Sequence, residues 1–443
     1  MSASRKIHLI ADISLIHTLG KWRYPGSWEG YGPYGDPALY LDIARLLERG
    51  LFDGAFFADV AGTPLFNGSP SDTVEWGVAW PRHDPLPMAI AMAAVTKHLG
   101  FVTTMSMTYH HPFNVARLYS SVDHVTAGRI AYNAVVSGFP QEAQNFGYET
   151  TPDHEWRYRR AEEFQEVIDK LFKSVDADAM LWDRETGRVA DPDKVRRIDH
   201  AGEFFKVMGP LPCAPSPQGR PVQVQAGGSA SGIELAGRWA DFQFAATGSR
   251  EGDRAVRDKL NASAVAHGRT ARDLGVLWAR RFDVVSGPEE AEHNRRKFLE
   301  SIPEQMGLVF VSQWWGLDGY RLDPRRTVHE TIAEVKELGV GPNWSYLDNA
   351  VANSEPTTTI AEYVQSWLGA SNGWIGTAEE IADMMEEDHE ALDANGGFMI
   401  APRVGVPGGF ARFIDEVVPV LQKRGLYKTG YEGRTMRENL CVY

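Results

Sequence analysis

The 443-residue sequence contains only two cysteines, Cys213 and Cys441, too few for the disulfide framework that stabilises small secreted domains. It also lacks a long apolar run: the longest, 88–95, is far shorter than the roughly 20 residues that a membrane-spanning helix needs. No signal segment with a cleavage site precedes the first predicted strand. These absences predict a protein of the reducing cytoplasm without a membrane segment.

Positive charge is scarce as well, since 45 lysines and arginines stand against 59 aspartates and glutamates, a formal net charge of −14. An acidic balance of this kind argues against nucleic acid or an anionic membrane as the main partner. The sequence has no H-E-x-x-H, C-x-x-C or G-x-S-x-G motif. We therefore predict no metal site, and hydrolase chemistry has no visible signature.

Short runs rich in β-branched or aromatic residues alternate along the chain with amphipathic helical stretches. This alternation is typical of βα units on a parallel sheet. Eight such strands predict a (β/α)8 TIM barrel, because the other common choice, a doubly wound sheet, usually has fewer strands. The predicted strands are 7–13, 54–58, 101–105, 130–136, 222–226, 242–245, 276–285 and 397–402.

A bare barrel needs about 250 residues, so this chain has a large surplus. Two long insertions account for it, 138–220 after the fourth strand and 287–375 after the seventh. We predict one domain spanning 1–443 in which both insertions cover the carboxyl ends of the strands, where barrel enzymes place their active sites. The second insertion is rich in tryptophan.

The segment Gln225-Ala-Gly-Gly-Ser-Ala-Ser-Gly232 lies between a predicted strand and a predicted helix. Its glycines let the backbone approach an anion, and the first N–H groups of the helix point toward it. Ser229 replaces the second glycine of G-x-G-x-x-G, and no P-loop lysine is present, so ordinary dinucleotide and NTPase sites are disfavoured. A phosphate cradle and a plain turn with a serine N-cap fit this segment equally well.

Other polar residues lie where strands end or helices begin. Asp59, Thr104 and Ser106 follow or end the second and third strands, and Asn133 and Ser137 flank the end of the fourth. The carboxyl ends of barrel strands are where substrates and cofactors bind, although capping explains each residue taken singly.

Two further polar residues, His154 and Tyr158, lie four residues apart and therefore on one helix face. Both side chains are able to donate a hydrogen bond to a phosphate. The surrounding segment taken alone favours a solvated, charge-rich helix instead.

An ordered series of segments resembles the flavin-dependent monooxygenases of the bacterial-luciferase-like superfamily, in the branch of the nitrilotriacetate, EDTA and dibenzothiophene-sulfone monooxygenases. Examples are Asp-His-Val-Thr-Ala-Gly-Arg at 123–129 and Asn-Ala-Val-Val-Ser at 133–137. The resemblance covers nearly the whole chain. Its segments are 98–100, 112–117, 123–129, 133–137, 142–147, 154–164, 210–212, 216–219, 225–227, 376–382 and 419–425.

The resemblance implies a TIM barrel that takes reduced FMN from a separate NAD(P)H:flavin oxidoreductase. With O2 as co-substrate, a flavin peroxide would oxygenate a small organic compound containing nitrogen or sulfur, often with C–N or C–S cleavage. It also implies a homodimer or homotetramer. The residues that it assigns to FMN are Asp59, Thr104, Ser106, Asn133 and Ser137 around the ring and ribityl chain, and His154, Tyr158, Ser229 and Ala230 at the phosphate.

For the substrate side we expect Phe57, Trp314 and Trp315 as pocket walls, with the tryptophan pair forming part of a lid. Core packing is an equally good interpretation of Phe57 and its neighbour Phe56. The segment 14–25 and the tryptophan pair depart from the family's pattern, so the substrate of a named relative does not transfer.

Residues for acid/base or positioning roles are His17, Tyr109 and His110, with Ser137 near the reactive edge of the flavin. Lys21 or Arg23 would meet a substrate carboxylate, against the simpler interpretation of an exposed cation.

Two alternatives to the monooxygenase stay open. One is an oxidoreductase of the same superfamily that transfers hydride with deazaflavin F420 and without O2. The other is a non-catalytic flavin-binding protein on the same barrel. The cofactor that binds, and substrate-dependent oxygen consumption, distinguish the three.

Overall fold

The structure is a computed structural model of the chain. It describes residues 6–14, 16–18, 20–32, 34–63, 71–247, 249–318, 322–338, 344–369, 373–392, 396–403 and 405–440.

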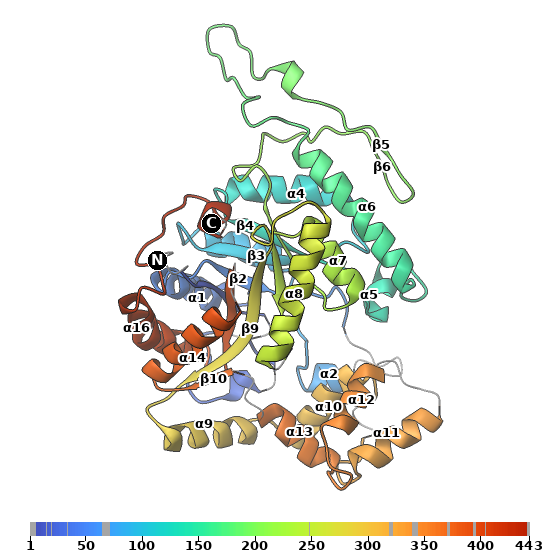
Figure 1. The fold of residues 1–443 in the computed structure, drawn as a ribbon, viewed down its shortest axis with the longest axis vertical. Coiled ribbons are helices and arrows are strands. Elements are labelled where there is room, and N and C mark those ends of the chain that lie inside the picture. Colours follow the sequence, from blue (N-terminus) through green and yellow to red (C-terminus); the bar gives the residue numbers. More distant parts are fainter. Residues whose placement is uncertain are drawn as a thin grey trace.

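Eight parallel strands close into a ring, because β11 pairs with both β9 and β1 while the other members pair in chain order (Figure 1). The predicted TIM barrel is therefore confirmed. A short additional strand, β10 (Gly373–Gly376), pairs with the second half of β9 outside the ring. The ring strands are β1 (His8–Asp12), β2 (Gly54–Phe57), β3 (Gly100–Ser106), β4 (Ile130–Val135), β7 (Val222–Ala226), β8 (Phe242–Ala245), β9 (Gly275–Val284) and β11 (Gly396–Pro402).

Helices surround the ring, and several begin with a proline in the first turn, where its fixed φ and missing N–H cost nothing. In α1, for example, Asp36 precedes Pro37 and its carboxylate accepts from the N–H of Ala38 at 2.9 Å. The surrounding helices are α1 (Pro37–Arg49), α3 (Pro85–Ala93), α4 (Pro112–Val125), α5 (Pro140–Asn145), α6 (His154–Phe172), α7 (Ala230–Trp239), α8 (Arg250–Ala266), α14 (Ala378–Ala391), α15 (Gly408–Arg412), a π-helical turn (Phe413–Val417) and α16 (Val418–Lys423). No described helix is long and apolar enough to cross a membrane.

Alternate residues of each strand separate two cores. On β9, Leu277 packs inside the barrel with Phe56 and Val224, whereas the next residue, Trp278, packs between the strands and the outer helices. The short helix α17 (Met436–Leu440) contributes Met436 to the inner core and so closes the amino-terminal end of the barrel. The carboxyl end is the end left for a site.

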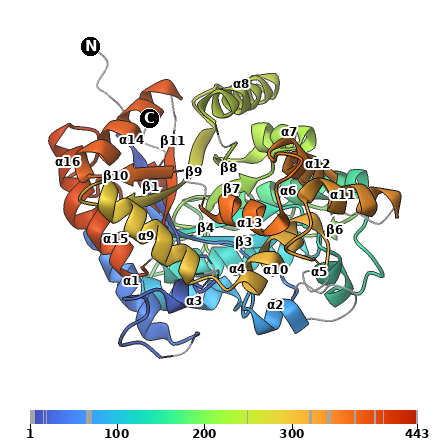
Figure 2. The same cartoon turned by 90° about the horizontal axis from the view of Figure 1, so that it is seen from below.

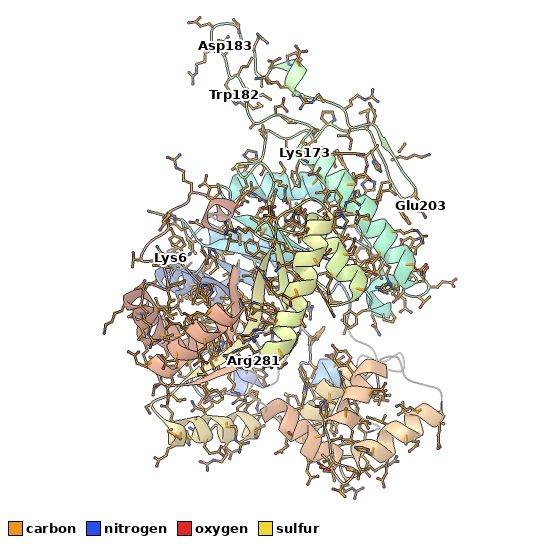
Figure 3. All side chains as sticks on the ribbon, in the orientation of Figure 1. Lys6, Lys173, Trp182, Asp183, Glu203 and Arg281 are labelled. Atoms are coloured by element: carbon orange, nitrogen blue, oxygen red, sulfur yellow. The ribbon has the colours of Figure 1, made fainter. Side chains whose placement is uncertain are left out.

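The first insertion meets only in part our expectation that it covers the carboxyl ends of the strands: its start packs on the loops after β2 and β3, but the rest does not. Residues 174–220 follow the end of α6, extend as an arm and return to the amino-terminal side (Figure 1). There Gln218 donates to the carbonyl of Ile130, the first residue of β4, at 2.8 Å. Trp182 and Asp183 lie near the tip of the arm (Figure 3). The reason is geometric: α6 runs antiparallel to β4, so a segment placed after it starts at the opposite end of the barrel. The arm contains η2 (Pro192–Lys194), β5 (His200–Ala201) and β6 (Lys206–Val207).

The second insertion is a group of helices with its own hydrophobic core, on the carboxyl side of β9. Figure 1 draws it below the barrel, and Figure 2 views the molecule from that side. The short helix α2, which follows β2, packs against it. The turn η1 (Lys21–Arg23) after β1 also reaches it, since Arg23 donates to the carbonyl of Ser301 at 3.2 Å. The helices of the insertion are α9 (Pro288–Glu300), α10 (Glu304–Trp315), α11 (Val328–Glu337), α12 (Trp344–Ala352) and α13 (Ile360–Gly369), and α2 spans Ser71–Glu75.

A buried ion cluster ties the C-terminal segment to the base of the barrel. The Asp53 carboxylate pairs with the ammonium of Lys428, lies 3.4 Å from Nδ1 of His8 and accepts from the N–H of Leu9 at 2.9 Å. Burial opposes ionisation of Asp53, but Lys428 and His8 together hold its pKa at about 2. Because the pKa of Asp53 is lower in the fold than in the unfolded chain, its ionised carboxylate stabilises the fold. This stabilisation is complete above the unfolded-state pKa and is lost as the pH falls toward 2.

We expect Asp53→Asn to lower the free energy of unfolding at pH 7 by about 3 kcal/mol, because Lys428 is left buried without its counter-ion. The loss should shrink as the pH falls from 4 toward 2, since acid neutralises the wild-type carboxylate too. Urea unfolding at several pH values measures this. Asp415→Asn, which breaks an exposed ion pair with Arg49, is the control and should cost under about 1 kcal/mol. Equal losses in the two variants would contradict the analysis.

Candidate active site

A chain of hydrogen bonds links the carboxyl ends of β2, β3 and β4. The Thr104 hydroxyl donates to the carbonyl of Phe57 at 2.8 Å, and the Asn133 amide donates to the Thr104 hydroxyl oxygen at 3.0 Å. Both side chains lie on the inward faces of their strands, in step with Val102 and Ala131 of the inner core. Asn133 Oδ1 is buried and has no partner among the described residues, so the wall presents a free acceptor.

Two serines continue this polar wall. The Ser137 hydroxyl donates to the Ser106 hydroxyl oxygen at 2.8 Å, and the Ser137 N–H donates to the Thr108 hydroxyl oxygen at 3.1 Å. Both serines are buried. The prediction that Thr104, Ser106, Asn133 and Ser137 lie together at one end of the barrel agrees with these contacts.

The predicted phosphate residues also come together, from the starts of two helices. Ser229 is the N-cap of α7, its hydroxyl oxygen accepts from the N–H of Gly232 at 3.1 Å, and it lies 3.1 Å from the Tyr158 hydroxyl. The rings of His154 and Tyr158 are 4.6 Å apart, and Ala230 is the first residue of α7. A side chain added at Gly228 would meet nothing within 4 Å, so the loop is open. A cavity of about 910 Å³ lies alongside, lined by His154, Tyr158 and the helix surfaces around them.

Asp59 follows β2 and is mostly buried, with the guanidinium of Arg82 at 4.0 Å. Burial raises the pKa of the Asp59 carboxyl to about 6, and Arg82 opposes this rise without cancelling it. The group therefore titrates close to neutral pH, in the range where an acid or base is useful.

His17 lies under an aromatic cover on the other side of β2. Its ring is 4.4 Å from that of Tyr34, and its Nε2 is 3.2 Å from the carbonyl of Trp80. Because a carbonyl only accepts, Nε2 carries the proton and Nδ1 keeps its lone pair. Burial lowers the pKa of His17 to about 4, and Nδ1 has no partner among the described residues. The imidazole is thus a neutral acceptor at pH 7.

Tyr109 and His110 follow β3 and both contact Phe146. The Tyr109 ring stacks on Phe146 at 5.1 Å, and the His110 ring meets its edge at 5.3 Å. Arg160 holds the loop by donating to the carbonyls of Met107 and His110. Burial raises the pKa of Tyr109 and lowers that of His110, so both groups stay neutral at pH 7.

The predicted substrate walls need correction. Phe57 points outward into the core between strands and helices, and its neighbour Phe56 occupies the inner face, 4.4 Å from Phe244. The alternation along a strand decides this. Trp315 is 2% exposed in the core of the helical insertion, 5.6 Å from Tyr363, and therefore is not an exposed wall. The side chain of Trp314 lies outside the described residues.

Sequence reasoning missed Arg281 and left Lys21 and Arg23 undecided. Arg281 continues the inward series Leu277, Ala279 on β9, so the alternation was the signal that would have found it. Lys21 is close enough to Arg281 for the two positive charges to repel each other. Arg23 instead donates to the carbonyl of Ser301 in the helical insertion. Among the described residues no cluster of three or more His, Cys, Asp or Glu side chains is arranged to hold a metal ion.

Comparison with known proteins agrees with this geometry. The chain is 35% identical to a dibenzothiophene-sulfone monooxygenase of Rhodococcus erythropolis (strain XP), over 99% of this chain and 97% of the relative. It is also 35% identical to component A of the nitrilotriacetate monooxygenase of Aminobacter aminovorans, with the same coverage. A riboflavin lyase solved with a modified FMN and riboflavin superposes with a TM-score of 0.86 at 29% identity, covering 99% of this chain and 96% of the other. The profile of the luciferase-like monooxygenases matches residues 20–395, and together these findings show that the chain belongs to that family.

Proposed function

We propose that this chain is the oxygenating component of a two-component monooxygenase that uses reduced FMN and O2 on a small organic compound containing nitrogen or sulfur. The observation that carries the proposal is the convergence of His154, Tyr158 and Ser229 at one end of the polar wall that contains Asn133. An open anion cradle next to a polar barrel mouth suits a ligand with a phosphate and a flat, hydrogen-bonding ring.

The residues fit FMN on three counts. The cradle combines two helix starts with hydroxyl and imidazole donors, which favours a phosphate. The glycine loop leaves room for the backbone to approach that phosphate. Asn133 Oδ1 is a buried acceptor that lacks a donor among the described residues, and the ring or ribityl chain of FMN carries donors.

In this proposal the phosphate is held by His154, Tyr158, Ser229 and the N–H of Ala230, and the ring side by Asp59, Thr104, Ser106 and Asn133. Reduced FMN, when bound, supplies the electrons that activate O2 for transfer of one oxygen atom. The chain itself binds and orients the substrate and excludes water. The helical insertion shields the mouth from the carboxyl side.

Proton handling falls to neutral groups beside the mouth. Nδ1 of His17 accepts a hydrogen bond from the substrate or a bound water, and its Nε2–H stays on the Trp80 carbonyl. The Ser137 hydroxyl donates to the Ser106 hydroxyl oxygen, and this bond fixes the position of the Ser137 side chain just after β4. Tyr109 and His110 position the neighbouring loop.

We also infer a separate flavin reductase, which reaches the chain at least by diffusion of reduced FMN, and a homodimer or homotetramer. The support is that a relative is named as one component of its enzyme. A cytoplasmic location fits a supply of NAD(P)H. Relatives named as monooxygenases at 35% identity favour oxygen transfer over F420-dependent hydride transfer or simple flavin binding.

Ser229→Ala and His154→Ala should each weaken the binding of reduced FMN by about tenfold, because each removes a hydrogen bond to a charged group. Anaerobic titration with reduced FMN, oxidised FMN and F420 measures the affinities side by side. Ser121→Ala, which removes an exposed hydroxyl on α4, is the matched control. If both variants bind reduced FMN like the wild type, the phosphate assignment is wrong, and a preference for F420 would replace the function.

Asp59→Asn should raise the free energy of unfolding at pH 8 by roughly 2 kcal/mol and leave it unchanged at pH 3. The reason is that the Asp59 pKa is raised to about 6 in the fold, so the carboxyl stabilises the fold only while protonated and this contribution is lost as the pH rises through 6. Urea unfolding at pH 3, 6 and 8 tests this. If the variant is less stable than the wild type at pH 8, the attraction between Arg82 and the Asp59 carboxylate stabilises the fold by more than burial of that charge destabilises it.

A further inference from the structure

Two neighbouring arginines on β9 have opposite surroundings. The Arg280 side chain points outward and forms ion pairs with Asp253 at 2.6 Å and Asp388 at 3.3 Å. Arg281 points the other way, toward the barrel interior, because strand residues alternate and Leu277 lies in the inner core. Its place near the end of β9 puts it at the carboxyl mouth, at the edge that faces the helical insertion (Figure 3).

Lys21, in the turn η1 after β1, joins Arg281 at this mouth. Among the described residues neither the Lys21 ammonium nor the Arg281 guanidinium has a hydrogen-bond or ion-pair partner. Desolvation by the surrounding protein, followed by repulsion from Arg281, lowers the pKa of Lys21 to about 8. Desolvation also lowers the pKa of Arg281. Arg281 is exposed and Lys21 is partly exposed, so both positive charges are accessible from the mouth of the barrel.

The nearby acidic group offsets only one of these charges. Asp12, at the end of β1, attracts both cations, and one of its oxygens already accepts from the N–H of Ser14 at 2.9 Å. The third cation of this region, Arg403 on the loop after β11, donates to the carbonyl of Gly369 at 2.7 Å and is engaged there. The Lys21–Arg281 pair thus carries net positive charge in a chain whose overall charge is −14.

The cofactor phosphate does not account for this charge. The phosphate cradle lies at the carboxyl end of β7 and the start of α6, and the polar wall occupies β2 to β4. In the closed ring, β9, β11 and β1 form the opposite arc. This arc is the part of the mouth that the flavin-binding residues leave free, and it faces the remaining reactant.

We propose that Lys21 and Arg281 bind an anionic group of the substrate, a carboxylate or a sulfonate, and that this chain acts on small organic acids rather than neutral compounds. The inference rests on the proposed function, since it assigns the substrate side of the same site. The planar fork of Arg281 suits two oxygens of such a group, and the Lys21 ammonium adds a point charge. A neutral substrate would leave one of these two positive charges without compensation.

The test uses calorimetric titration of the full chain, with and without bound FMN. The probes are two matched pairs of similar size, benzoate against benzamide and methanesulfonate against dimethyl sulfone. We expect each anion to bind at least about tenfold more tightly than its neutral partner, and the carboxylate and sulfonate pairs to show which group is preferred. Equal binding within both pairs, or no binding of either anion, would overturn the proposal.

Variants separate the two cations from general electrostatics. Arg281→Met and Lys21→Met should each reduce anion affinity about tenfold, and Arg281→Lys should retain part of it. Arg23→Met removes one charge from the same turn and is the control, because Arg23 is directed to Ser301. Unchanged anion affinity in both Met variants would sink the assignment.

Flavin titrations of the same variants keep the two proposals apart. Lys21→Met and Arg281→Met should bind reduced FMN like the wild type. If they lose reduced FMN as strongly as Ser229→Ala does, the cations serve the cofactor and the substrate assignment is wrong. If the wild type binds no FMN, the proposed function fails, while the anion titrations of the flavin-free chain still decide the role of this pair.

Discussion

The pairing of β11 with both β9 and β1 closes the parallel sheet, and the rest of the molecule depends on this closure. Once the ring is closed, each ring-strand residue faces either the interior or the surrounding helices, and each of the eight described ring strands has a neighbour on both sides. The inner core then fills the ring from its amino-terminal end, which Met436 closes. Toward the opposite end the inward residues include polar side chains such as Thr104 and Asn133, which are available to ligands.

The mouth that results is divided by chemistry. One arc, from β2 to β7, carries neutral hydrogen-bonding groups and leads to the open helix start at Ser229. The other arc carries Lys21 and Arg281 against Asp12. Burial favours the uncharged forms of the titratable groups between the two arcs: it raises the pKa of Asp59 to about 6 and lowers the pKa of His17 to about 4. Such a site lowers the solvation of reactants.

Much of this arrangement was predictable. The eight ring strands follow from short apolar runs that alternate with helical stretches, and the meeting of Asn133 with Thr104 follows from the rule that parallel strands end together. The convergence of Tyr158 and Ser229 was expected only from the resemblance, because nothing local relates two helices 71 residues apart. Phe57 was assigned to the wrong face, since a fully apolar strand shows no alternation to read. The arm at 174–220 was predicted at the carboxyl end of the barrel and lies at the amino-terminal end. The prediction did not take into account that α6 runs back along the barrel after β4, so the arm starts from the opposite end.

By itself the sequence determined the barrel, the eight strands along the chain and the polar residues at the strand ends. These depend on local periodicity, on capping and on connections between neighbouring elements, all of which are written within a few residues of each other. Only the tertiary structure decided which cations are paired and which are not. Arg280, Arg281 and Arg23 look alike in the sequence, yet their surroundings differ. Arg280 forms ion pairs, Arg281 lies on the inward face of β9, and Arg23 donates to a carbonyl of the helical insertion. Pairing depends on groups that come from distant segments, and their positions exist only after the ring has closed.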